Sequence, residues 1–188
     1  MARAAAARTA EPPPIEGEDE TTDLVSVIGW QHNQVRYLQE QLEAIPGVSK
    51  GGDRAKQQQR VSIVDMMRLR LAPHETAEAQ HLWPTVRKYL PEGDALVDKA
   101  LAQETEGTQL LMQLDAVPGG DPQFDELVEE LSSALRKHVA HEDLVLLRVS
   151  EEVPVKVRDD LGKKFLRAFK ELLQDDAGRP AERKGRAR

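Results

Sequence analysis

The sequence predicts an all-α protein, an antiparallel up-down four-helix bundle with an additional C-terminal amphipathic helix. Apolar residues recur at intervals of three and four along most of the chain, which is the period of one helix face. No segment alternates apolar and polar residues for long enough to indicate a strand. Short turns rich in proline and glycine separate four segments of roughly 20 residues, a pattern typical of up-down bundles.

The first half of the chain supplies two of these helices. The first should begin at a cap formed by Thr22 or Asp23 and end at Pro46. Its apolar stripe contains Leu24, Ile28, His32, Val35, Leu38 and Leu42. The second should follow the linker Gly51-Gly52 and continue to the turn at 91–94. One face of it carries Arg60, Val64, Met67, Leu71, His74, Glu78 and His81.

The second half supplies the other helices. The third should end at the turn 118–120, and its predicted stripe is Val97, Leu101, Glu104, Thr108, Leu111 and Leu114. The fourth should be capped by Asp121, since Pro122 is tolerated in a first helical turn. Its stripe includes Phe124, Leu131, Leu135, His138, Glu142 and Val145. Pro154 opens a fifth amphipathic segment with Leu161, Phe165, Phe169 and Leu172 in register.

These signals divide the chain into four parts. We predict a disordered leader at 1–21, the four-helix bundle at 22–150, the C-terminal helix at 151–175 and a basic disordered tail at 176–188. The leader combines a run of prolines with an acidic stretch and has no face to bury.

Composition narrows the classes of function. The 188 residues suit one domain, and their formal net charge of -7 argues against a nucleic-acid partner. The chain has no cysteine, which excludes disulfides and thiolate metal sites. No apolar run approaches the roughly 18 residues of a membrane span, and no apolar segment of a signal peptide follows the basic start. We therefore expect no membrane partner and a cytoplasmic location.

The histidines are the residues that most strongly indicate a functional site. All lie on or beside the predicted apolar stripes, although histidine is seldom buried without a reason. They are His32, His74, His81, His138 and His141. His74 precedes Glu78 by four residues, and His138 precedes Glu142 by the same interval, so each pair places an imidazole beside a carboxylate on one helix face.

His32 on the first helix and Glu104 on the third complete an interior layer drawn from four helices. Alone, one such His-Glu pair could be an ordinary pair on a solvated face. Several buried carboxylates without a cation would instead cost several kcal/mol each in desolvation. Imidazole and carboxylate together suit iron, zinc or copper, and bundles with inward Glu and His residues hold two-metal centres. The sequence therefore predicts a metal site.

Three segments resemble a known family. They are PHETAEAQHLWPTVRKYLP, GDALVDKALAQETEGTQLLMQLD and ELSSALRKHVAHED, and the opening helix DLVSVIGWQHNQVRYL is similar to the family's first histidine motif. Over about residues 22–150 the chain resembles the hemerythrin-like HHE cation-binding domains. The resemblance implies a bundle with a carboxylate-bridged di-iron site that meets dioxygen or related small oxidants. It assigns ligand positions to His32, His74, Glu78, His138 and Glu142.

The third helix departs from the family pattern. Glu104 stands where the family usually has a histidine, and Thr108 stands where oxygen carriers have a second one. The more carboxylate-rich site that results resembles di-iron oxidases and oxygenases. His81 could replace the missing imidazole, or it could be a core histidine bonded to a carboxylate. His141 is expected to support the ligands or lie at the surface.

Three functions follow from the resemblance. The leading expectation is a non-haem di-iron protein that binds or reacts with dioxygen, peroxide or nitric oxide, although manganese and zinc also suit the ligands. The alternatives are a di-iron oxygenase or oxidase with a small organic substrate, and a non-catalytic iron-binding or sensing module. A large pocket beside the metals would favour the former alternative, and a sealed apolar layer would favour binding or sensing. The C-terminal amphipathic helix should pack on the bundle or on a second copy of the chain, which would give a homodimer through this helix.

Overall fold

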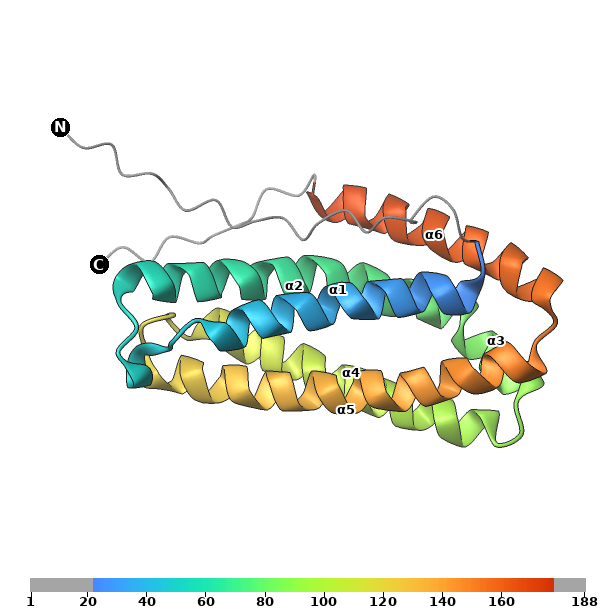
Figure 1. The fold of residues 1–188 in the computed structure, drawn as a ribbon, viewed down its shortest axis with the longest axis horizontal. Coiled ribbons are helices and arrows are strands. Elements are labelled where there is room, and N and C mark those ends of the chain that lie inside the picture. Colours follow the sequence, from blue (N-terminus) through green and yellow to red (C-terminus); the bar gives the residue numbers. More distant parts are fainter. Residues whose placement is uncertain (1–21, 178–188) are drawn as a thin grey trace.

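In the computed structural model, residues 22–177 are described and form a bundle of long helices with no strand in that range (Figure 1). The helices are α1 Leu24–Ala44, α2 Arg54–His81, α3 Trp83–Tyr89, α4 Gly93–Ala116, α5 Pro122–Glu152 and α6 Val155–Ala177, with a short 3-10 helix η1 at Val48–Lys50. The predicted leader and all but the first residues of the predicted tail lie outside the described range. Helix α6 reaches Ala177, past its predicted end.

Aspartate side chains cap three of the long helices, α1, α2 and α5. Asp23 accepts a hydrogen bond from the amide of Val25 at 2.9 Å, so it is Asp23 that caps α1. Asp53 accepts from the amide of Lys56 at 3.0 Å, and Asp121 from Gln123 at 2.9 Å. Each cap satisfies an amide that has no partner inside its helix.

The sequence pattern predicted one helix from the linker Gly51-Gly52 to the turn at 91–94, and this prediction is wrong because the structure has two helices there. The helix breaks at Leu82, and α3 starts at Trp83 with Pro84 in its first turn. Proline lacks the amide hydrogen that would continue the α2 ladder and is tolerated in a first turn, so the break falls where that bond would be lost.

Two apolar clusters fill the bundle. The first includes Ile28, Ala77, Val97 and Val145, and the second includes Val35, Leu71, Leu110 and Leu135. Four helices therefore pass from one cluster to the other: α1 and α4 run from the first to the second, and α2 and α5 run back. The segments between the clusters, one on each of these helices, carry the polar residues described below.

Helix α4 presents a different face from the predicted one. Leu101 is 37% exposed and Thr108 is exposed, whereas Ala100 and Gly107 are buried. The buried face is one residue earlier than predicted in these two turns. Its small residues give little hydropathy signal, and the bulky Leu101 misled the pattern.

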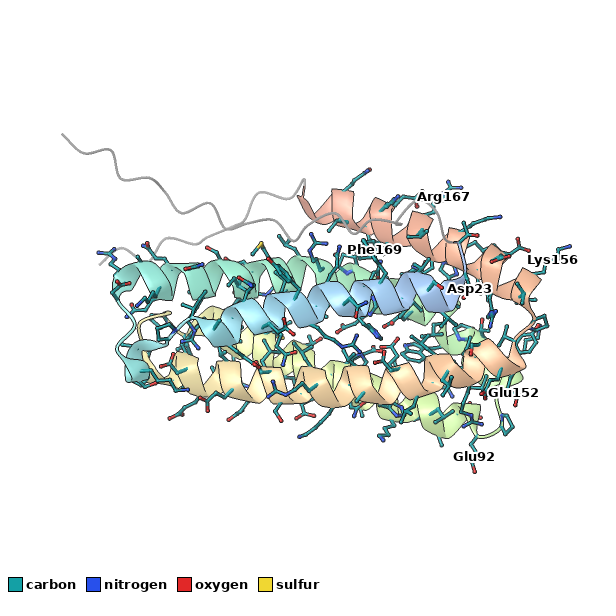
Figure 2. The ribbon with its side chains drawn as sticks, viewed as in Figure 1. Asp23, Glu92, Glu152, Lys156, Arg167 and Phe169 are labelled. Carbon is teal, nitrogen blue, oxygen red and sulfur yellow. The ribbon has the colours of Figure 1, made fainter. Side chains whose placement is uncertain are left out.

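Helix α6 packs on α1 and α2 of the same chain (Figure 1). Figure 2 shows Phe169 on the side of α6 toward the bundle and Arg167 on the opposite side. Phe165 and Phe169 are both buried. A Cβ at Gly162 would lie 1.9 Å from the carbonyl oxygen of Thr22, so α6 approaches the start of α1 closely enough to require glycine. None of the described helices has the length and apolar content needed to cross a membrane.

Candidate metal centre

A layer of histidine and glutamate side chains separates the two apolar clusters. Helix α1 contributes His32, α2 contributes His74 and Glu78, α4 contributes Glu104, and α5 contributes His138 and Glu142. All are buried except Glu104, which is half-buried. The helical period explains the layer, because each ligand-bearing turn lies between apolar turns of the same face.

The layer contains two groups of potential ligands that share one carboxylate. In the first group, one ligand atom from each of four residues lies within 4.8 Å of the others; these are His32, His74, Glu78 and Glu142. The second group meets the same limit and comprises Glu78, Glu104 and His138. Glu78 belongs to both, which is the arrangement a bridging carboxylate requires.

Glu142 also contacts imidazoles of both groups. Its Oε2 lies 3.1 Å from Nε2 of His32 and 3.3 Å from Nε2 of His138. On the other side of the first group, Nε2 of His74 lies 3.0 Å from Oε1 of Glu78. The Nε2 atoms of three histidines therefore point toward two completely buried carboxylates.

Several of these polar atoms lack any hydrogen-bond partner within the described chain. They are both carboxylate oxygens of Glu78, Oε1 of Glu142 and Nδ1 of His138. The contact from His74 to Glu78 is short, but its geometry is not that of a hydrogen bond. Unpaired buried carboxylates are costly, and a cation would satisfy them. The donor set of imidazole nitrogen and carboxylate oxygen fits a divalent metal.

The pKa values of the two buried carboxyl groups, Glu78 and Glu142, shift in opposite directions. Burial, together with the neighbouring Glu142, raises the pKa of Glu78 well above its usual range. Burial would also raise the pKa of Glu142, but His32 and the hydrogen bonds around it hold that pKa well below its usual range. Without a cation, then, a proton shared by this pair is held more readily by Glu78 than by Glu142.

The histidines of the first group also differ in pKa. Burial alone would lower the pKa of His32, but Glu142 and Asp143 raise it to about 9. The pKa of His74 falls to about 3, because its burial outweighs the attraction of Glu142. Within the first group, His32 is therefore the imidazole that keeps a proton more readily.

The structure separates the remaining candidates from both groups. His81 belongs to neither group; it is half-buried, and its pKa is lowered by burial and by Lys164 on α6. His141 is buried and donates from Nε2 to the carbonyl oxygen of Leu96 at 3.0 Å, which ties α5 to α4. Of the two residues weighed for the missing helix α4 ligand, Glu104 lies in the layer and His81 does not.

Three supporting residues were missing from the predicted site. Asp143 accepts a hydrogen bond from Nδ1 of His32 at 2.9 Å, and Oε1 of Gln31 accepts one from Nδ1 of His74 at 2.6 Å. Trp83 donates from Nε1 to Glu104 at 3.0 Å. Asp143 and Gln31 each adjoin a ligand in the sequence. Their polar character beside an inward residue was the available signal, but only packing shows which ring each one reaches.

The fold and this layer define a helical-bundle protein with a buried cation-binding centre of histidine and glutamate. The family model of the hemerythrin HHE cation-binding domain matches residues 23–149, so the chain belongs to that family. This confirms the resemblance read from the sequence.

A DNA nickase of Nostoc sp. (strain PCC 7120 / SAG 25.82 / UTEX 2576) is a more distant relative, 27% identical over 132 residues. The alignment covers 70% of this chain and 34% of the nickase, so the chain spans about a third of that relative. No solved structure matches the chain.

Proposed function

We propose that this protein holds two iron ions in the buried layer and binds or reacts with dioxygen, peroxide or nitric oxide. The observation that carries the proposal is that Glu78 belongs to both ligand groups. A buried carboxylate shared by two sets of donors is suited to bridge two cations and to balance their charge. The alternating direction of the helices between the two apolar clusters supports the up-down antiparallel order that such centres use.

The two ions would have different ligands. His32 and His74 would hold the first ion, and His138 and Glu104 the second, with Glu78 and Glu142 between them. When bound, iron supplies a centre that changes oxidation state and accepts small oxidants as ligands. The protein orients the imidazoles and carboxylates, and the apolar clusters on both sides exclude water from them.

The space beside the second group supports a small oxidant rather than an organic substrate. A cavity of about 10 Å³ is bordered by Glu75, Glu104, Gly107 and His138. That volume admits roughly one water-sized molecule. A Cβ at the buried Gly107 would meet no atom within 4 Å. Close contact between helices therefore does not require glycine at this position, which borders the cavity.

The other functions have less support. An oxygenase or oxidase would need room for its organic substrate, which this cavity does not supply. A non-catalytic iron-binding or sensing module remains the competing proposal, because the chain corresponds to only part of its nickase relative. We propose neither a nucleic-acid nor a membrane partner, since the formal net charge is -7.

The test is a metal assay combined with oxidant titration. The purified chain, reconstituted with ferrous iron without air, should bind two irons per molecule and develop new visible absorption on addition of air, peroxide or nitric oxide. Iron binding without any optical response would favour the non-catalytic module. A chain that takes up no iron, manganese or zinc would contradict the proposal.

Metal affinity should rise with pH between about 7 and 9. His32 has a pKa raised to about 9 in the metal-free site, so below that pH a metal must displace its proton. Displacing the His32 proton strengthens binding about tenfold per pH unit, and this contribution should level off above about pH 9. Displacing the proton that burial and Glu142 favour on Glu78 adds to the rise. Competition with a chromogenic chelator for Zn²⁺ at several pH values measures this. An affinity independent of pH would show that His32 is not a ligand.

A further inference from the structure

We propose that Asp143 is the positioning residue for His32 and, with Arg36, makes this imidazole the most strongly donating one in the centre. The inference rests on the proposed metal centre. It adds a residue outside both ligand groups that shapes the site from the protein surface.

Two adjacent residues of α5 hold opposite sides of the His32 ring. Glu142 Oε2 lies 3.1 Å from Nε2, and Asp143 Oδ1 lies 2.9 Å from Nδ1. Successive residues on an α-helix point roughly 100° apart, so two neighbouring carboxyl groups can reach both edges of a ring packed against the helix. The proton on Nδ1 is therefore directed to Asp143, which leaves the Nε2 lone pair for a cation once the second proton has left.

Arg36 holds Asp143 in place at the surface. Its guanidinium pairs with Oδ2 of Asp143, the oxygen that does not contact His32, and also donates to Asn33 at 2.8 Å. Arg36 follows His32 by four residues on α1, so both lie on one side of that helix and both meet Asp143. A chain of hydrogen bonds thus runs from the half-exposed Arg36 and Asp143 to the buried ring.

The other histidines have weaker support. His74 donates from Nδ1 to the amide oxygen of Gln31 at 2.6 Å, a neutral acceptor. Nδ1 of His138 has no partner within the described chain. A carboxylate acceptor raises the basicity of a metal-bound imidazole more than a neutral amide does. Among the three imidazoles, His32 therefore has the strongest hydrogen-bond support at Nδ1, and His138 has none within the described residues.

This grading makes the two ion positions unequal. The first position receives both supported imidazoles, His32 and His74, whereas the second receives His138 alone. An electron-rich ligand stabilises the more highly charged form of a metal. The ion held by His32 should be the one that is bound more tightly and oxidised more readily.

The experiment compares Asp143→Ala and Asp143→Asn with a matched control, Asp65→Asn. Asp65 is 42% exposed and paired with Arg68, much as Asp143 is 43% exposed and paired with Arg36. Neither aspartate belongs to a ligand group, but Asp143 contacts His32, whereas Asp65 lies on α2 nine residues before His74. Asp143→Asn keeps an acceptor for Nδ1 and removes the charge. Asp143→Ala removes both, so the pair separates the hydrogen bond from the charge. Circular dichroism establishes that each variant is folded.

Zn²⁺ is the first probe, because it is redox-inert and diamagnetic. Of the two ion positions, the one that binds Zn²⁺ more tightly should lose affinity about 10- to 100-fold in Asp143→Ala. The loss should be smaller in Asp143→Asn and absent in Asp65→Asn. The downfield Nδ1 proton resonance of His32 in the zinc-loaded protein should shift in Asp143→Asn and disappear in Asp143→Ala. In the iron-loaded protein, Asp143→Asn should raise the reduction potential.

Each outcome decides one of the two proposals. If the unsubstituted chain binds metal and Asp143→Ala matches it in affinity and in the His32 resonance, the role of Asp143 is wrong and the metal centre stands. If the unsubstituted chain binds no metal, the proposed function fails, and the inference fails with it. Loss of affinity in Asp65→Asn as well would show a general charge effect and would also overturn the inference.

Discussion

Replacing Glu78 with glutamine is expected to abolish binding at both ion positions while making the metal-free protein more stable. Glu78 is completely buried and belongs to both ligand groups. Removing a group that only hydrogen-bonds to a ligand typically lowers metal affinity about 10- to 100-fold. Removing a ligand that both ions share should lower the affinity by more than that.

The stability change has the opposite sign because of the surroundings of Glu78. Within the described residues neither of its oxygens has a partner at hydrogen-bond geometry, and Glu142, whose pKa is lowered, lies beside it. A glutamine amide could donate to Glu142 and would remove the penalty of a buried acid. We expect the metal-free free energy of unfolding to rise by about 1–3 kcal/mol.

Glu104→Gln provides the comparison for this prediction. Glu104 belongs only to the second group, so its substitution should lower the affinity at the second ion position and leave the affinity at the first unchanged. Metal stoichiometry and urea unfolding of the metal-free proteins measure both effects. A Glu78→Gln variant that retained both ions would contradict the shared carboxylate, and equal losses in the two variants would contradict the division into two groups.

Truncating Phe165 to alanine is expected to lower the free energy of unfolding by about 3–5 kcal/mol, the usual cost of removing a fully buried aromatic ring. Phe165 is 0% exposed and belongs to the first apolar cluster. Its ring also meets the imidazole of His74 edge-on, with centroids 6.1 Å apart. The change should therefore loosen a ligand as well as the core.

Arg167→Ala on the same helix is the control for this change. Arg167 is 81% exposed and, among the described residues, is paired with Glu171, one turn away, so its loss should leave the free energy of unfolding almost unchanged. Urea unfolding with and without metal checks both variants. Equal stabilities for the two would show that α6 contributes little to the bundle.

Ending the chain after residue 153 would remove α6 entirely and should cause unfolding or self-association, because the apolar surface of α1 and α2 under the helix becomes exposed. The same packing bears on the expected homodimer. Phe165 and Phe169 predicted that this helix packs on the bundle or on a second copy, and in the structure it packs on α1 and α2 of the same chain. A dimer through α6 stays a proposal that would need other residues.

Periodicity was sufficient to predict the helices and much of the site. His32, His74, Glu78, His138 and Glu142 each lie at a helical interval from apolar neighbours, and all five are buried. Their register depends on chain geometry alone, since a residue four positions from a buried leucine lies on the same face. The family assignment rests on the same residues.

The apolar period gave a wrong prediction in two places, where the buried side chains are small and where proline removes a backbone amide donor. Ala100 and Gly107 line the inner face of α4, yet neither carries enough apolar surface to outweigh Leu101 in a hydropathy pattern. The break at Leu82 depends on Pro84, whose effect the continuous apolar period concealed.

By itself, therefore, the sequence determined that this chain is all-helical, belongs to a cation-binding family and buries a set of imidazoles and carboxylates. Only the tertiary structure decided how they meet: that Glu78 is shared, that His81 lies apart beside α6, and that Asp143 reaches His32 across 111 positions of sequence. The physical reason is that helical period specifies the direction of a side chain on its own helix. Contacts between helices depend on how the helices pack, which residues far apart in the sequence determine together.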